Sequence, residues 1–198
     1  MLTDLVPVTA RGEATRRKLL AAAEEEFGGK GFHPASVSSI TTRAGVGQGT
    51  FYLYFRSKEE IFVTLVREIG GTLRRRMRSA AEQAADHLEA ERLGLRTLLD
   101  FTYEHPGLLR IVQESQFVDE AVFREYHERL AKSCADSLRD AAQRGESTPG
   151  DADTRAWAVM GIGHALGMRW CLWQGRLPDD KVIDEAMQLV SRGIALNA

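Results

Sequence analysis

Apolar residues recur along the chain at intervals of three and four, and Gly or Pro interrupts this pattern between the apolar stretches. Leu19, Ala23 and Phe27, for example, share one face of a helix. The chain has no run that alternates between apolar and polar residues as a strand does, and it has no internal repeat. The sequence therefore predicts an all-α protein.

Capping residues set the limits of the predicted helices. Ser36 is a plausible N-cap, Gly45 occupies a left-handed helix stop, and Ser57 with Glu60 forms a capping-box pattern. The first two predicted helices span residues 11–29 and 36–44, the third starts at residue 47 or 48 and runs through residue 54, and a long fourth helix follows Ser57. Beyond residue 78 the predicted helices are 86–104, 106–116, 120–144, 151–174 and 179–196.

Composition fits a globular protein with one sizeable core or two small ones, since 43% of residues are hydrophobic and 27% are charged. Cys134 and Cys171 have no CxxC or Cys/His spacing, so we expect no disulfide framework and no structural zinc site. We also expect no other metal and no cofactor. His164 and Arg169 interrupt the longest apolar run, which favours a buried helix over a membrane span. The first residues, MLTDLVPVTA, lack the features of a signal peptide, and we therefore expect a cytoplasmic location.

Charge is divided unevenly along the chain, although the net charge is only -2. Residues 1–78 carry 13 Lys/Arg against 8 Asp/Glu, whereas residues 79–198 carry 13 against 20. This asymmetry favours a nucleic-acid-binding portion joined to a portion with another role. The sequence predicts a boundary between these two portions, residues 1–57 and 58–198, at residue 57.

The stretch AGVGQGTFYLYFRSKEE, residues 44–60, places four aromatic residues between a glycine turn and a capped helix. Two short helices joined at Gly45 form a helix-turn-helix unit, whose second helix can lie in the major groove of DNA. Phe51 and Phe55 are four residues apart and can share a core-facing side. Tyr52 and Tyr54 lie off that side.

The residues off the core-facing side have chemistry suited to DNA. Tyr52 and Tyr54 can present hydroxyl groups to phosphates, and Lys58 can place its ammonium on a phosphate. Gln48 and Thr50 can reach base edges. Gly49 allows the backbone to approach closely.

The span TRRKLLAAAEEEFGGKGFHPASVSSITTRAGVGQGTFYLYFRSKEEIFVTLVRE, residues 15–68, resembles the DNA-binding domain of the TetR family of bacterial one-component regulators. The resemblance implies a homodimer that binds a pseudo-palindromic DNA operator, usually as a repressor, and is released by a small molecule. Two departures from the family pattern are Thr41, where alanine is usual, and Gly47, where serine often caps the helix. By motif position the family's DNA contacts fall on Gln48, Gly49, Thr50, Tyr52, Tyr54 and Lys58, with Leu53 at a variable position. Further candidates on the preceding helix are Ser36, Ser39 and Arg43.

The segment HPGLLRIVQESQFVDEAVFREYHERL resembles the middle of TetR-family sensor domains less specifically. Its apolar residues can line a cavity, and the interleaved polar residues can anchor an apolar or amphipathic ligand, although core packing explains the same pattern. The candidate ligand residues, with two tryptophans from the later helices, are Phe101, Leu109, Arg110, Gln113, Glu114, Phe117, Phe123, Tyr126, Trp157 and Trp170.

The resemblance also implies that the last two predicted helices form a four-helix dimer interface. Small residues in AWAVMGIGHALGMRWCLW allow helices to approach closely. Trp157, Trp170 and Trp173 can face either the partner or the cavity. The candidate interface residues are Gly161, Gly163, Gly167, Met187, Val190 and Ile194.

Other functions remain as alternatives. An enzyme is disfavoured because the five histidines form no HExxH or ligand array, and no nucleophile elbow or P-loop is present. A non-specific architectural DNA binder is disfavoured by the acidic larger portion. The run RRRMR at 74–78 is better explained as a solvated helix face than as a second DNA contact. Activation instead of repression, and regulation without a ligand, both stay open.

Overall fold

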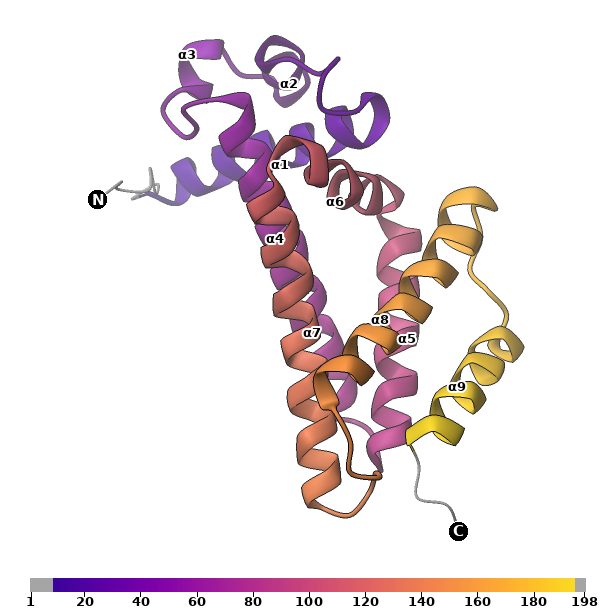
Figure 1. Ribbon diagram of the computed structural model, residues 1–198. Helices are drawn as coiled ribbons and strands as arrows, with labels where there is room; N and C mark the ends of the chain where they lie inside the picture. Colours follow the sequence, from indigo (N-terminus) through magenta and orange to yellow (C-terminus); the bar gives the residue numbers. More distant parts are fainter. Residues whose placement is uncertain (1–8, 195–198) are drawn as a thin grey trace. The chain divides into compact units, whose positions relative to one another are not determined.

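The computed structural model describes residues 9–194, with side chains through Arg192. Most of the N-terminal stretch used to predict location, residues 1–8, and residues 195–198 lie outside the described part. Within that part every regular element is a helix, as the sequence predicts, and the N-terminal helices contain the predicted helix-turn-helix (Figure 1). The chain divides into two compact units: unit 1 comprises residues 1–69 and 107–124, and unit 2 comprises residues 70–106 and 125–198.

Unit 1 is built from α1 (Ala10–Lys30), α2 (Val37–Ala44), α3 (Gln48–Phe51), the first half of α4 (Lys58–Ala81) and α6 (Pro106–Val118) from Gly107 onward. Figure 1 shows α6 close to the C-terminal end of α1. The core joins these elements through fully buried aromatic and aliphatic side chains. They include Leu19, Phe27, Ile40, Phe51, Ile61 and Phe62.

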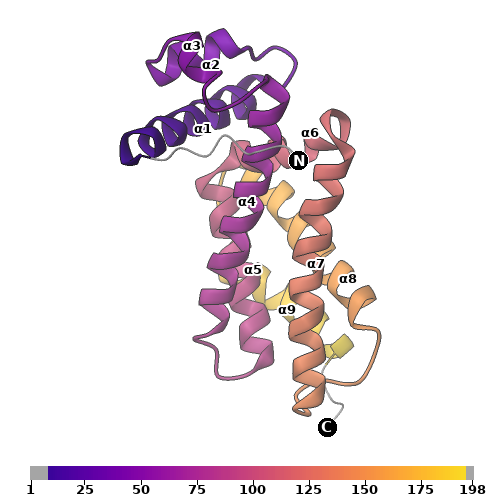
Figure 2. The same ribbon diagram turned by 90° about the vertical axis from the view of Figure 1, so that its left-hand side faces the viewer.

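Unit 2 contains the second half of α4, then α5 (His87–Glu104), most of α7 (Glu120–Gln143), α8 (Ala152–Leu166) and α9 (Asp180–Ile194). The turn at residues 82–86 makes the second half of α4 and α5 antiparallel (Figure 2). Two apolar clusters fill this unit. Leu138 and Ala156 lie in one cluster with Val190, and Leu99 and Ile183 lie in the other with Cys171.

Two predicted helices differ from the structure. The helix predicted at 47–54 ends at Phe51, because the amides of Leu53 and Tyr54 bond to carbonyls three residues back and tighten the chain into turns. The helix predicted at 151–174 changes at Gly167 into a π-helical segment, η1 (Gly167–Trp173). There the buried Cys171 thiol donates to the carbonyl of Leu99 in α5 at 3.4 Å.

The contact units divide the chain differently from the predicted boundary at residue 57, which falls inside unit 1. The functional division at that residue stays a prediction. No helix in residues 9–194 is both long and apolar enough to span a membrane.

Candidate nucleic-acid interface

The turn between α2 and α3 is fixed by one glycine. Gly45 has φ of 68° and ψ of 34°, a left-handed conformation that favours glycine. The amide of Val46 then donates to the carbonyl of Thr41 at 3.0 Å. Thr41 itself is buried, and its hydroxyl donates to the carbonyl of Ser38 at 3.1 Å, so the threonine that replaces the usual alanine is accommodated with its polar atom bonded.

A capping box starts α2. The Ser36 hydroxyl accepts from the amide of Ser39 at 3.0 Å, and the Ser39 hydroxyl accepts from the amide of Ser36 at 3.1 Å. Both predicted DNA contacts therefore also stabilise the helix that carries them. Gly47, by contrast, caps α3 without any side-chain bond.

The aromatic residues after the turn separate into two sets, which confirms the predicted division of Phe51 and Phe55 from Tyr52. Phe51 is fully buried and Phe55 is 2% exposed, with their ring centroids 5.7 Å apart. Tyr52 is 53% exposed and Leu53 is 68% exposed. Tyr54 is half-buried. Large exposed apolar side chains beside a rigid core are suited to contact another molecule.

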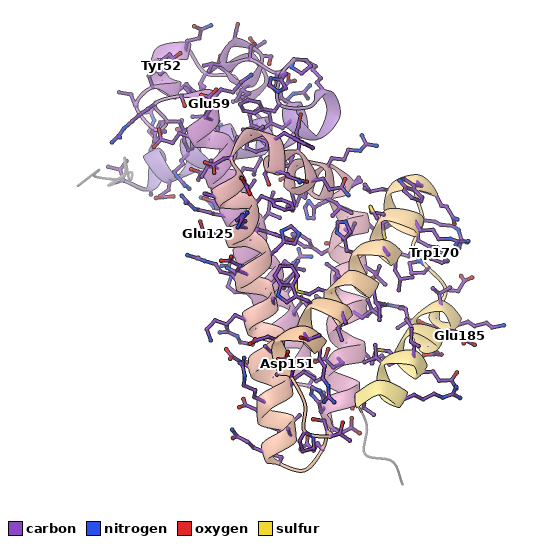
Figure 3. All side chains as sticks on the ribbon, viewed as in Figure 1. Tyr52, Glu59, Glu125, Asp151, Trp170 and Glu185 are labelled. Atoms are coloured by element: carbon purple, nitrogen blue, oxygen red, sulfur yellow. The ribbon has the colours of Figure 1, made fainter. Side chains whose placement is uncertain are left out.

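The predicted base-contacting residues share the exposed side with Tyr52. Gln48 and Gly49 are exposed and Thr50 is half-buried. Tyr52 lies at the outer edge of the α2–α3 region (Figure 3). The structure thus brings Gln48, Gly49, Tyr52 and Leu53 together on one short, accessible segment.

Arg43 at the end of α2 is held by two carboxylates of α1. Its guanidinium lies 2.6 Å from Glu25 and 2.8 Å from Glu26. Glu26 is only 2% exposed, and a hydrogen bond from Lys30, with others from Ser39 and Arg43, lowers its pKa to about 2. Sequence reasoning missed Glu26, because EEE inside an amphipathic helix is typical of a solvated face.

Lys58 is also engaged within unit 1. Its ammonium donates to the carbonyls of Phe32, His33 and Ala35 at 2.9, 3.4 and 3.0 Å. It also lies 4.2 Å from the centroid of the Phe32 ring. The predicted phosphate donor therefore already binds the loop between α1 and α2.

The predicted ligand residues fall in both units. In unit 1, Phe117 is 82% exposed and Arg110 is exposed, whereas both carboxylate oxygens of Glu114 lie 2.8 Å from the amide of Phe32. The other candidates in this unit are half-buried: Leu109, Gln113 and Phe123.

In unit 2, the candidate ligand residues lie on four helical segments. Phe101 is buried beneath the guanidinium of Arg76. Tyr126 is half-buried, and burial raises its pKa to about 12. Trp157 stacks on His127 with centroids 6.4 Å apart and is 50% exposed. Trp170 is half-buried and lies on η1 (Figure 3).

The predicted dimer residues divide by exposure. Gly161 is exposed, whereas Gly163, Gly167 and Val190 are buried within their own unit. A Cβ at Gly163 would lie 2.6 Å from the side chain of Leu98, so this glycine serves the packing of α8 on α5. The half-buried Met187 packs against both apolar clusters, and the side chain of Ile194 lies outside the described residues.

Two further residues of unit 2 expose large apolar side chains, and of these Leu189 was not predicted to take part in an interface. Trp173 on η1 is 74% exposed and Leu189 on α9 is 68% exposed. Amphipathic periodicity signals only which residues are apolar. It does not tell which apolar side of a helix is covered by the same chain.

Comparison with known proteins supports the DNA-binding interpretation of α1–α4. A family model described as bacterial regulatory proteins of the tetR family matches residues 19–65. The HTH-type transcriptional regulator YdgC of Bacillus subtilis is 46% identical over 66 residues, which are 33% of this chain and 34% of that protein. The HTH-type transcriptional activator FasR of Mycolicibacterium smegmatis is 27% identical over 129 residues, which are 65% of this chain and 59% of that protein.

These matches span about a third of YdgC and less than two thirds of FasR. The likeness in fold extends further. The structure of the transcriptional regulator FadR from Bacillus subtilis, solved in complex with stearoyl-CoA, has a TM-score of 0.80 to this chain at 23% identity, covering 89% of this chain and 98% of FadR. The helix-turn-helix geometry and the family match over residues 19–65 show that this part of the chain is a DNA-binding domain of the tetR family of bacterial regulatory proteins, and the shared fold extends the structural likeness to the helices that follow.

Proposed function

We propose that this regulator binds a pseudo-palindromic DNA operator as a homodimer, represses transcription, and is released by an apolar or amphipathic small molecule. In this proposal residues 1–57 read the operator and residues 58–198 regulate and dimerise. The observation that carries the DNA-binding part is the exposed segment with Gln48, Tyr52 and Leu53, which a buried aromatic core supports from behind.

The residues of this segment have proposed roles that their chemistry allows. Gln48 and Thr50 contact base edges, and the Tyr52 hydroxyl contacts a phosphate. Gly49 lets the backbone approach. Removing a base contact relaxes specificity at one position, whereas removing a phosphate contact weakens binding to all sequences.

Selection of bound DNA from a random library tests operator recognition and does not require a known binding site. The expected product is a two-fold symmetric sequence bound at least about 10³-fold more tightly than scrambled DNA. Gln48→Ala should relax selection at one symmetric pair of positions, and Tyr52→Phe should weaken all DNA about equally. Glu128→Gln, an exposed change on α7, is the control and should alter neither. Recovery of no common sequence would reject an operator-specific function.

Dimerisation through α8 and α9 is supported by exposed apolar side chains on unit 2. Trp157 on α8, Trp173 on η1 and Leu189 on α9 are each at least half exposed, and large exposed apolar side chains become buried when two proteins associate. Light scattering at micromolar protein should give the mass of a dimer. Leu189→Lys should shift the mass toward that of a monomer. The control Gln188→Lys, at the neighbouring exposed position, should leave the mass unchanged. A monomeric wild-type protein would refute the dimer.

The proposed effector is a long-chain acyl thioester. Support comes from the shared fold with FadR, which was solved with stearoyl-CoA. Stearoyl-CoA should raise the melting temperature and release the selected operator, whereas free CoA should do neither. Operator binding unaffected by acyl-CoA, fatty acid and aromatic compounds would favour a ligand-independent regulator.

Activation is a second candidate for the sign of control, because FasR is an activator. Transcription in vitro from a promoter that carries the selected operator distinguishes the two. Repression predicts fewer transcripts when the protein is added, and activation predicts more.

A further inference from the structure

The peptide groups of Phe32 are held by opposite charges from two distant helices. Both carboxylate oxygens of Glu114, on α6, lie 2.8 Å from the Phe32 amide nitrogen, and the Lys58 ammonium, on α4, lies 2.9 Å from the Phe32 carbonyl oxygen. Charged partners make stronger hydrogen bonds than neutral ones do. We call Glu114, Phe32 and Lys58 the Phe32 clamp.

The side chain of Phe32 fixes the same residue from a third direction. It is 6% exposed, and its ring meets that of Phe62 edge-on at 5.0 Å and that of Phe27 at 5.7 Å. Because backbone and side chain are both held, Phe32 has little freedom to move.

Gly31 makes room for the carboxylate. It has φ of +84°, and a Cβ there would lie 3.1 Å from an oxygen of Glu114. The loop therefore requires glycine for its backbone conformation and for the close approach of Glu114.

A second contact anchors α6 to α1. A Cβ on Gly28 would lie only 2.7 Å from the Cα of Gly107, so the two backbones touch. Gly107 and Glu114 are seven residues apart, which places them on the same face of α6 about two turns from each other. This face of α6 thus contacts α1 and the following loop at two points.

All three ammonium protons of Lys58 have acceptors in this loop. A lysine has three N–H donors, and the carbonyls of Phe32, His33 and Ala35 are within reach of them. A phosphate would have to displace one of these carbonyls. The loop leads directly to Ser36, the N-cap of α2, so its position sets where the helix-turn-helix begins.

We propose that Glu114 and Lys58 are positioning residues for operator binding. They act through the Phe32 clamp on the start of α2, and they touch neither the DNA nor the effector. The inference rests on the proposed DNA-binding function, and it gives Glu114 a role different from the ligand anchor predicted from sequence.

For a substitution of Glu114, simple electrostatics and loss of the Phe32 clamp predict opposite changes in DNA affinity. Removal of a negative charge from a DNA-binding unit should strengthen attraction to DNA. Loss of the clamp should instead weaken binding to the operator. Glu114→Leu removes the hydrogen bonds entirely, whereas Glu114→Gln retains one neutral acceptor and should have an intermediate effect.

The first measurement is operator affinity across a salt series, with the sequence selected by the wild-type protein. Glu114→Leu and Lys58→Met should each weaken binding at least about tenfold. The slope of log affinity against log salt should stay unchanged for Lys58→Met. Loss of one phosphate contact from each subunit of a dimer would instead reduce that slope by about 2. Glu120→Gln, which removes an exposed negative charge of unit 1 at the start of α7, is the control and should bind the operator no more weakly than the wild type.

The second measurement is hydrogen exchange of the free protein, which does not depend on any DNA. The amides of residues 31–33, 35 and 36 should exchange faster in Glu114→Leu, while amides 61–66 in α4 exchange as in the wild type. Unchanged exchange at 31–36, or operator binding as tight as the wild type, would overturn the role of Glu114. A slope reduced by about 2 would overturn that of Lys58. If the wild-type protein selects no operator, the proposed function fails, and the exchange result still decides whether the clamp holds the loop.

Discussion

The buried carboxylate of Glu26 should stabilise unit 1 far more than its exposed neighbour Glu25 does. Glu26 is 2% exposed and accepts hydrogen bonds from Lys30 and Arg43, both at 2.8 Å. The lowering of its pKa from 4.5 to about 2, chiefly by Lys30, corresponds to about 3.4 kcal/mol at 1.36 kcal/mol per unit. Because the Lys30 and Arg43 side chains are 53% and 44% exposed, water screens both, and we expect Glu26→Gln to cost about 2 kcal/mol at pH 7.

The loss should depend on pH in a defined direction. A carboxyl group with a lowered pKa in the folded protein contributes fully above its unfolded pKa, here 4.5, and the contribution falls as pH decreases toward about 2. The stability difference between the wild type and Glu26→Gln should therefore narrow to less than about 1 kcal/mol at pH 3.

Urea unfolding followed by circular dichroism at pH 7 and pH 3 measures both quantities. The control is Glu25→Gln, since Glu25 pairs with the same Arg43 but has a side chain that is 63% exposed. An exposed pair of this kind contributes about 0 to 1 kcal/mol. Equal losses for the two variants at pH 7, or a Glu26→Gln loss that is the same at both pH values, would refute the reasoning.

Three further predictions concern the effect of single substitutions on the free energy of unfolding. Gly28→Ala should lower the free energy of unfolding in urea by at least about 1 kcal/mol, since the added Cβ would lie 2.7 Å from the α6 backbone. Gly29→Ala is the control: a Cβ there would meet nothing within 4 Å, and the free energy of unfolding should rise by about 0.5 to 1 kcal/mol. Burial raises the pKa of Glu91 from 4.5 to about 7, and His87 lies 3.8 Å away. A carboxyl group with a raised pKa in the folded protein makes the protein less stable as pH rises from 4.5 through 7. Between pH 5 and pH 8, the unfolding free energy of Glu91→Gln should therefore rise by about 2 kcal/mol relative to that of the wild type. Phe51→Ala, at a fully buried ring, should cost about 3 to 5 kcal/mol by the same unfolding measurement, and a loss below about 1 kcal/mol would contradict the assigned core.

Local sequence rules predicted the helices best where a cap or a glycine ends them. The first helix, predicted at 11–29, spans Ala10–Lys30, and the second, predicted to start at Ser36, has Ser36 as its N-cap. The third was predicted too long because its periodicity continues to Tyr54, although the chain must turn earlier to bring Phe55 into the core.

Local sequence rules could not predict contacts between residues that are far apart in the sequence. Glu114 lies 82 residues from Phe32, and an acidic residue among Arg110 and Gln113 has the pattern expected of a ligand anchor. Sequence spacing does not show which backbone amide lies opposite a carboxylate. For the same reason, the ion pairs of Arg43 with α1 were not predicted, although the exposure of Tyr52 and the burial of Phe51 followed from helical geometry alone.

The discontinuity of unit 1 has a consequence for how such regulators can be recombined. Residues 107–124 belong to this unit, although most of the C-terminal sequence belongs to the other. A chimera made by a single cut near residue 57 would pair this loop with a foreign α6, and the Phe32 amide would lose its carboxylate unless the donor protein supplies one at the same position. Modular exchange of operator specificity between relatives should therefore succeed when α6 is transplanted together with the N-terminal helices.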